Sequence, residues 1–227
     1  MTTTLQPNRT PQLGYTALPL ELHNQQQWVL WNDDAGWPQA YMAKGKRADC
    51  YHPEDLATLD SVALHLMEMP NHGIAFWLSR KDPYAVIYVK DCRDAKSGEI
   101  ADWARPILDE FSTYAEINES GTGIKLWTKA MLPGLHPGLR FKVGEGAVAI
   151  VGGWCCVTVT GCPVDLKTGK LVTVPQYCEV APSNEAVLKW WNHFTASEDE
   201  FLGEFIGSSP IELWGDPSHM EFDASFV

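Results

Sequence analysis

Residues 114–161 carry the pattern that decides the fold. Four apolar stretches follow one another here: Tyr114-Ala-Glu-Ile-Asn, Gly123-Ile-Lys-Leu-Trp-Thr-Lys, Ala147-Val-Ala-Ile-Val and Cys155-Cys-Val-Thr-Val-Thr. Their length and content are typical of strands. Glu119-Ser-Gly-Thr-Gly joins the first two, and the pair Gly152-Gly153 joins the last two. Because short glycine-containing joints are typical of hairpins, the sequence predicts two successive hairpins.

Further strands are expected before this block. They cover Gln27-Trp-Val-Leu-Trp, Gly73-Ile-Ala-Phe-Trp-Leu and Tyr84-Ala-Val-Ile-Tyr-Val. Ser79-Arg-Lys-Asp-Pro separates the last two and predicts a hairpin loop. After the block, residues 163–174 predict a short ribbon around a turn at 165–170.

Amphipathic helices are expected beside these strands. One begins at Pro53 and ends at Pro70, with its leucines on one face. A second has apolar residues at spacings of three and four over 100–114, and Pro106 kinks or restarts it. A third covers residues 183–194. The mixture predicts the α/β (α+β) fold class.

Composition divides the chain into three parts. Residues 1–22, with three prolines and little periodicity, predict an extended arm. Residues 23–180 hold the expected strands and predict two lobes that share a cleft. Residues 181–227 predict a helix followed by an acidic extension that also contains aromatic residues. No apolar run reaches the ~18 residues of a membrane-spanning helix, and the first ten residues lack the order of a signal peptide. A cytoplasmic protein without membrane contact is expected.

Charge and cysteine content narrow the function classes. The formal net charge is −12, and no lysine or arginine follows Lys189. Since nucleic-acid binding usually needs a basic stripe, direct nucleic-acid binding is expected to be weak or absent. The six cysteines form no Cys-x-x-Cys pair, so reduced thiols and no metal site are expected.

Several motifs together resemble one known family. They are Trp28-Val-Leu-Trp, Gly73-Ile-Ala-Phe, Cys92-Arg-Asp-x-x-x-Gly-Glu-Ile, Tyr114-x-Glu-Ile-x-x-Ser-Gly-Thr-Gly-Ile, Leu132-Pro-Gly and Thr158-Val-Thr-Gly. Their order and spacing, over residues 25–165, resemble the archaeo-eukaryotic primase superfamily, and within it the primase-polymerase domains of phages and plasmids. The resemblance implies an RRM-like antiparallel sheet flanked by helices.

The resemblance also implies a catalytic site, and this chain departs from it. Active members hold two metal ions with carboxylates. The two positions of their Asp-x-Asp motif match Tyr88 and Lys90, the histidine of Ser-Gly-x-Gly-x-His matches Lys125, and the third motif places Ala149 at its acid and Cys155 at its arginine. None of the three positions expected to carry a metal-binding carboxylate is acidic. A lysine at one of them would repel a divalent cation, so no metal cofactor is expected.

Neighbouring charged residues leave alternatives open. Asp91, Asp94 and Glu145 could rebuild a metal site, although a shift by one residue along a strand turns a side chain to the opposite face. Tyr88 and Lys90 are expected to project into one cleft and to fill or neutralise it. The basic residues Lys125, Lys129, Arg140 and Lys142 are either an anion-binding patch or scattered solubilising charge.

The C-terminal region offers the candidate partner contacts. They are Trp190, Trp191, Glu198, Asp199, Glu200 and Trp214. Aromatic anchors dominate binding energy at interfaces. A tail that packs back on its own domain is the alternative.

These features predict a catalytically inactive primase-polymerase-like protein of a phage or mobile element. It would bind, and inhibit or modulate, a host complex engaged with nucleic acid, of the replication or immune (CRISPR-type) machinery, in the host cytoplasm. The alternatives are an active, divergent primase or polymerase with a displaced metal site, and a non-catalytic accessory that binds nucleic acid or nucleotides.

Overall fold

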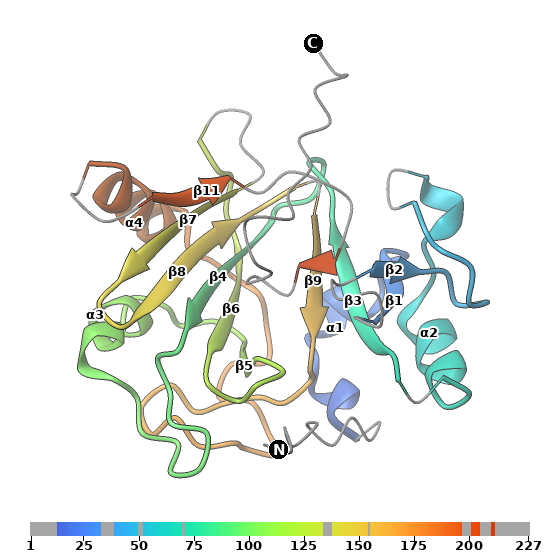
Figure 1. Ribbon diagram of the computed structural model, residues 1–227, viewed down its shortest axis with the longest axis horizontal. Helices are drawn as coiled ribbons and strands as arrows, with labels where there is room; N and C mark the ends of the chain where they lie inside the picture. Colours follow the sequence, from blue (N-terminus) through green and yellow to red (C-terminus); the bar gives the residue numbers. More distant parts are fainter. Residues whose placement is uncertain are drawn as a thin grey trace, which may run out of the picture.

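The computed structural model describes residues 13–32, 39–49, 52–69, 71–133, 138–153 and 155–196, and the backbone of 201–204 and 210–211. Within these ranges the chain forms two mainly antiparallel sheets and a few helices (Figure 1). The predicted mixed α+β class is therefore confirmed. None of the helices in these ranges is long and apolar enough to cross a membrane.

The five-stranded sheet has the order β12-β9-β3-β1-β2. Its strands are β12 (Pro210–Ile211), β9 (Cys155–Val159), β3 (Gly73–Leu78), β1 (Trp28–Asn32) and β2 (Gln39–Tyr41). The seven-stranded sheet has the order β10-β6-β4-β8-β7-β11, and β5 also pairs with β6. Its strands are β10 (Ala181–Pro182), β6 (Ile124–Lys129), β4 (Tyr84–Lys90), β8 (Gly146–Val151), β7 (Gly138–Val143), β11 (Phe201–Glu204) and β5 (Ala115–Ile117).

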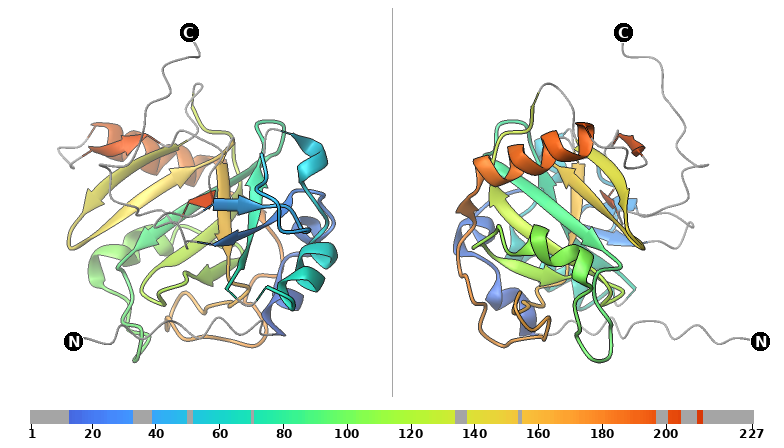
Figure 2. Two further views of the ribbon diagram at one scale, coloured as in Figure 1. Left: turned by 45° about the vertical axis from the view of Figure 1, so that its right-hand side comes forward. Right: turned by 90° about the vertical axis from the view of Figure 1, so that its left-hand side faces the viewer.

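Short helical segments surround the sheets. They are η1 (Leu13–Ala17), α1 (Leu20–His23), η2 (Pro53–Asp55), α2 (Leu59–Leu66), η3 (Asp102–Ala104), α3 (Arg105–Leu108) and α4 (Asn184–Ala196). The predicted extended arm is wrong for residues 13–22, because these residues form η1 and α1 and bury Leu18 and Leu22 in the core. α3 and α4 lie on one face of the seven-stranded sheet (Figure 2).

Two predicted helices are shorter than expected. The chain from Pro53 makes one 3-10 turn, and α2 begins only after Thr58, whose hydroxyl accepts from the Ser61 N–H. The interruption has a cause, since Ala57 pairs with Trp28. The helix predicted over 100–114 ends at Leu108, and Pro106 lies in its first turn, where its missing N–H is tolerated.

One apolar core lies between the two sheets. Alternate residues of β4 divide between two cores: Tyr84, Val86 and Tyr88 pack toward β9 and β3, whereas Ala85, Ile87 and Val89 pack toward α3 and α4. Because β4 is covered on both faces, nearly every residue in it is buried.

The first predicted hairpin is confirmed and the second is wrong. β5 and β6 pair in antiparallel register across the turn at 119–123. β8, however, pairs with β4 and β7, while β9 pairs with β3, so the chain at Gly152-Gly153 passes from one sheet to the other. The loop at 79–83 does the same between β3 and β4, and no hairpin forms there. Strands buried on both faces show no alternation that would identify their partner.

Two loops of similar sequence meet below the seven-stranded sheet. Asp94-Ala-Lys-Ser-Gly and Asp165-Leu-Lys-Thr-Gly each form a turn in which the aspartate Oδ1 accepts backbone N–H bonds from the residues two and three positions later. The second is the turn predicted at 165–170, closed by the Asp165 N–H donating to Lys170. The buried Arg93 directly precedes the first loop. It donates from Nε to the Gly169 carbonyl of the second loop at 2.5 Å and from Nη1 to the Gly121 carbonyl of the turn at 119–123 at 2.6 Å.

Gly169→Ala is expected to destabilise the protein by about 1 kcal/mol more than Gly121→Ala. Both glycines have positive φ, 67° and 76°, where a side chain costs about 1–2 kcal/mol. A Cβ on Gly169 would lie 1.9 Å from the Gly98 carbonyl oxygen, whereas one on Gly121 would meet nothing closer than 3.6 Å. Urea denaturation of both variants measures the difference, and equal losses would mean that the loops do not pack as described.

Candidate functional site

Three of the positions that the resemblance predicts to match catalytic residues lie in one row across the seven-stranded sheet. Tyr88 is the direct register partner of Lys125 on β6 and of Ala149 on β8. Arg140 on β7 is the next partner of Ala149. Directly opposed residues project from the same face, and Tyr88 and Ala149 place this face in the core between the sheets. The row is therefore an internal surface.

Tyr88 fills this internal surface. Its side chain is 3% exposed, and its hydroxyl accepts a hydrogen bond of 2.6 Å from Asn118 Nδ2. Lys90, two residues along β4, is half-buried on the same face. Cys155 lies in the same core on β9, and burial raises the pKa of its thiol to about 12. Cys155 therefore stays neutral and cannot replace the charge of an arginine.

Lys125 links the two sheets. It is 1% exposed, and its ammonium donates to Glu119 Oε1 at 2.7 Å and to the carbonyl and hydroxyl oxygens of Thr158 at 2.7 and 2.8 Å. Its Nζ also lies 5.7 Å from the centre of the Tyr88 ring, within cation–π range. Thr158 belongs to β9, so this one ammonium ties the five-stranded sheet to the seven-stranded sheet. Three protein oxygens already occupy it.

A second buried carboxyl lies beside Lys125. Glu116 is its register partner on β5 and is 0% exposed. Its Oε2 accepts the Gly161 N–H at 2.9 Å, while Oε1 has no hydrogen-bond partner among the described residues. Burial raises the pKa of Glu116, against the opposing effects of the Lys125 ammonium and the Gly161 N–H. Burial also acts to raise the pKa of Glu119, but the Lys125 ammonium, together with the hydrogen bonds of Glu119 to Thr158 and to its own backbone, lowers that pKa.

The two glutamates are expected to give opposite pH dependence. Because the pKa of Glu116 is higher in the folded chain, its folded form binds more protons, and the free energy of unfolding falls as pH rises above the usual value of 4.5. Glu116→Gln removes this loss, so the free energy of unfolding of the variant increases relative to that of the wild type as pH rises. Glu119 contributes stability above 4.5 that is lost as pH falls, so Glu119→Gln is weakest relative to the wild type at neutral pH. Urea denaturation from about pH 2 to 8 covers both windows, below 4.5 for Glu119 and above 4.5 for Glu116, and parallel profiles would contradict the assignment.

The structure does not bring the four basic candidates together. Lys129 lies four residues from Lys125 on β6 and pairs with Glu21 at 2.6 Å. Arg140 and Lys142 lie on β7, which β4 and β8 separate from β6. Arg140 is 4% exposed, and burial lowers its pKa. Lys142 is exposed.

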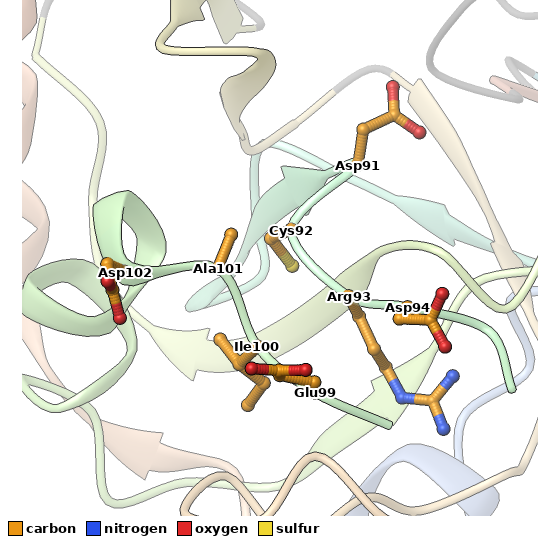
Figure 3. A pocket seen from close by; sticks show the side chains of 8 residues that line it. All are labelled: Asp91, Cys92, Arg93, Asp94, Glu99, Ile100, Ala101 and Asp102. Atoms are coloured by element: carbon orange, nitrogen blue, oxygen red, sulfur yellow. The ribbon is translucent and has the colours of Figure 1, made fainter. Parts of the chain in front are cut away.

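The acidic candidates lie beyond the ends of the strands. Asp91 and Asp94 line an open pocket together with Glu99, Asp102 and Arg93, and their carboxylates are spread around it (Figure 3). Asp91 has a φ of 52° and accepts from the Thr122 hydroxyl at 3.1 Å. Glu145 is exposed in the turn between β7 and β8. Among the described residues, no three His, Cys, Asp or Glu side chains are grouped as metal ligands.

The two tryptophans of α4 differ in their surroundings. Trp191 is 6% exposed and packs with Val187 and Phe194 against the seven-stranded sheet. Trp190 is half-buried, stacks on Phe194 at 5.5 Å and holds Lys189 over its ring at 5.4 Å. Glu198, Asp199, Glu200 and Trp214 lie outside the described residues. Among the residues that the structure describes, Cys92, Cys155, Cys156, Cys162 and Cys178 form no disulfide bond.

Sequence reasoning missed Glu116, Glu119 and Thr158 as parts of one buried network. The available signal was a charged residue in each of two strands that are otherwise apolar, at Glu116 and Lys125. Opposite charges facing one another across a hairpin predict a pair. The third member, Thr158, comes from the other sheet and has no local signal.

Comparison with known proteins gives one informative similarity. No protein-family profile matches the chain. A segment of 108 residues, 47% of the chain, is 29% identical to a DNA primase-polymerase of Nitratiruptor phage NrS-1. The segment covers 15% of that protein's length. The chain is thus distantly similar to a small part of a phage primase-polymerase.

Proposed function

We propose that this chain is a primase-polymerase-like protein of a phage or mobile element that does not catalyse nucleotidyl transfer and acts by binding a protein. The observation that carries this proposal is the row of Lys125, Tyr88 and Ala149. Two-metal catalysis needs carboxylates that face a solvent-filled site. In this row the ring of Tyr88 and the methyl group of Ala149 lie inside the core at two of the expected carboxylate positions, and the ammonium of Lys125 lies at the expected histidine position.

The contacts of Lys125 also argue against phosphate binding at this position. A lysine can bind phosphate through its ammonium. Here the ammonium donates to Glu119 and twice to Thr158, and its side chain is 1% exposed. A role as a nucleotide-binding accessory would therefore require this network to break.

The charge of the chain favours a protein partner that itself holds nucleic acid. A net charge of −12 resembles the charge of the nucleic acid that such a partner binds, so acidic surfaces can compete for a basic channel. The half-buried Trp190, beside the exposed end of α4, provides an aromatic anchor. We infer that the partner is a host replication or immune complex, and that binding inhibits or modulates it.

Capture from host lysate tests this proposal. Full-length chain is compared with a matched variant, Glu198→Gln/Asp199→Asn/Glu200→Gln, that removes three charges and keeps side-chain size. The expected result is a captured nucleic-acid-binding complex whose affinity for nucleic acid falls when the wild-type chain is added, and falls less with the variant. A chain that leaves the affinity of every captured complex unchanged would contradict the proposal.

One observation favours the enzyme alternative enough to test it. Asp91 and Asp94 follow β4 directly and line the same pocket as Glu99 and Asp102. Such a displaced site would support metal-dependent DNA or primer synthesis, and Asp91→Asn would abolish that synthesis.

The accessory alternative has a different test. Affinity for single-stranded DNA would fall steeply as the salt concentration rises.

A further inference from the structure

A buried polar cluster attaches the end of β9 to the seven-stranded sheet. Glu116 on β5 and Lys125 on β6 are direct register partners, so their side chains leave the same face of the sheet. Lys125 donates to Thr158 in β9, and Glu116 accepts the N–H of Gly161 just beyond β9. Figure 1 shows β9 beside β6. The segment 158–161 is therefore held by one cation and one carboxyl group.

The two glutamates of this cluster differ in their partners. Glu119 accepts from the Lys125 ammonium at 2.7 Å. Glu116 is 0% exposed, and its Oε1 atom has no hydrogen-bond partner among the described residues. Its Oε2 atom accepts from the Gly161 N–H at 2.9 Å and from the Tyr114 hydroxyl at 3.4 Å. Because a buried carboxylate with an unpaired oxygen is costly, these contacts suit a protonated Glu116.

Titratable groups face Glu116 from each element packed against it. They are Tyr15 of η1, Tyr114 before β5, Glu119 in the turn, Lys125 of β6 and Cys162 after β9. Burial and the neighbouring Glu116 raise the pKa of both tyrosines and of the cysteine, so these three groups are neutral. Among these described groups Lys125 is the only cation, and two carboxyl groups share it.

We propose that the proton on Glu116 is a switch for the contact between the two sheets. When Glu116 ionises, the Lys125 ammonium leaves Thr158 and pairs with the Oε1 atom of Glu116. The inference goes beyond the proposed function and does not depend on it.

The donors of Lys125 explain why the contact with Thr158 is lost. An ammonium has three N–H donors. The contacts with Glu119 Oε1 and with the carbonyl and hydroxyl oxygens of Thr158 already use all of them. A bond to Glu116 must therefore replace one of these. Releasing a neutral oxygen of Thr158 costs less than releasing the buried carboxylate of Glu119.

The direction of the switch follows from burial. Burial raises the pKa of Glu116, and the negative charge of Glu119 raises it further. The protonated form, with β9 attached through Lys125, is therefore the low-pH form. The attachment is lost as pH rises through the raised pKa, so a rise in pH loosens β9.

Nuclear magnetic resonance on the full-length chain labelled with ¹⁵N and ¹³C tests the switch. The carboxyl carbon of Glu116 reports its ionisation, and the coupling across the hydrogen bond from Lys125 Nζ to the Thr158 carbonyl carbon reports the contact. The coupling is expected at low pH and should vanish over the pH interval in which Glu116 ionises. Glu116→Gln should keep the coupling at every pH. Glu119→Gln should move the transition to lower pH, because it removes a charge that raises the pKa of Glu116.

Amide hydrogen exchange measures the consequence for the sheets. The amides of β9 are expected to exchange at least about tenfold faster above the transition, after correction for the intrinsic effect of pH, because the strand loses a charged hydrogen bond. β8 is the internal control, since β4 separates it from β6. Its amides should change less than those of β9.

Several results would overturn the inference. One is a coupling to Thr158 that persists after Glu116 has ionised, or a Glu116 that stays protonated until the chain unfolds. Another is a Glu116→Gln chain that loses the coupling as the wild type does. A third is an exchange rate in β9 that does not rise, or that rises equally in β8. If Glu116→Gln does not fold, the wild-type measurements decide.

Discussion

Lys125→Met is expected to lower the free energy of unfolding by about 3–5 kcal/mol, because it removes the cation from a buried network. Methionine keeps an unbranched side chain as far as Cε and lacks only the terminal ammonium, so the change isolates the ammonium. Glu119 then loses its partner at 2.7 Å, both oxygens of Thr158 lose a donor, and the buried Glu116 loses the positive charge that faces it. The link between the two sheets is lost with them.

Lys129→Met is the matched control. It lies on the same strand, also pairs with a glutamate, and is 36% exposed. Pairs of this kind contribute less than about 1 kcal/mol. Urea denaturation of both variants gives the comparison, and equal losses would show that Lys125 is solvated rather than built into the core.

Ala149→Asp is expected to destabilise the protein by at least about 4 kcal/mol, because it places a carboxylate in an apolar core. Ala149 is 0% exposed and faces the core between the sheets. The loss should grow as pH rises above about 4, where an ordinary aspartate ionises. At a solvent-exposed position the same substitution would cost little.

Ala147→Asp serves as the control for Ala149→Asp. The two positions are two residues apart on β8 and project from the same face. Ala147 is the register partner of both Lys90 and Lys142, so a carboxylate there lies between two lysines. Ala147 is also buried, at 5% exposed, but the two lysines offset the cost of a carboxylate there, so a smaller loss than that of Ala149→Asp is expected. Thermal and urea denaturation of the two variants compare a carboxylate beside two lysines with one in the apolar core.

The elements were more predictable from the sequence than their partners. Strands such as 73–78 and 124–129 are marked by aromatic and β-branched residues, and the turn at 119–123 identifies a hairpin by its glycines. The pair Gly152-Gly153 looked the same but carries the chain between sheets. Local sequence cannot distinguish the two cases, because β8 and β9 are buried on both faces.

The sequence singled out residues that the fold brings together, but it did not predict their contacts, and their match to catalytic positions stays a prediction. Counting along the motifs placed Tyr88, Lys125 and Ala149 at equivalent places, and the register puts them in one row. Whether Lys125 faces a phosphate or a carboxylate depends on Glu119 and Thr158, which lie 6 and 33 residues away. Such distant contacts follow from the packing of the two sheets and have no signal at Lys125 itself.

We propose that the row of Lys125, Tyr88 and Ala149 is closed by packing, so that this chain does not catalyse nucleotidyl transfer. The most direct test of this central claim is synthesis on a single-stranded DNA template with labelled deoxynucleotides and Mg²⁺ or Mn²⁺, beside an active primase-polymerase. The claim predicts no extension product at any metal or enzyme concentration that supports the active protein. Product formed by the wild-type chain and abolished by Asp91→Asn or Glu145→Gln would contradict it.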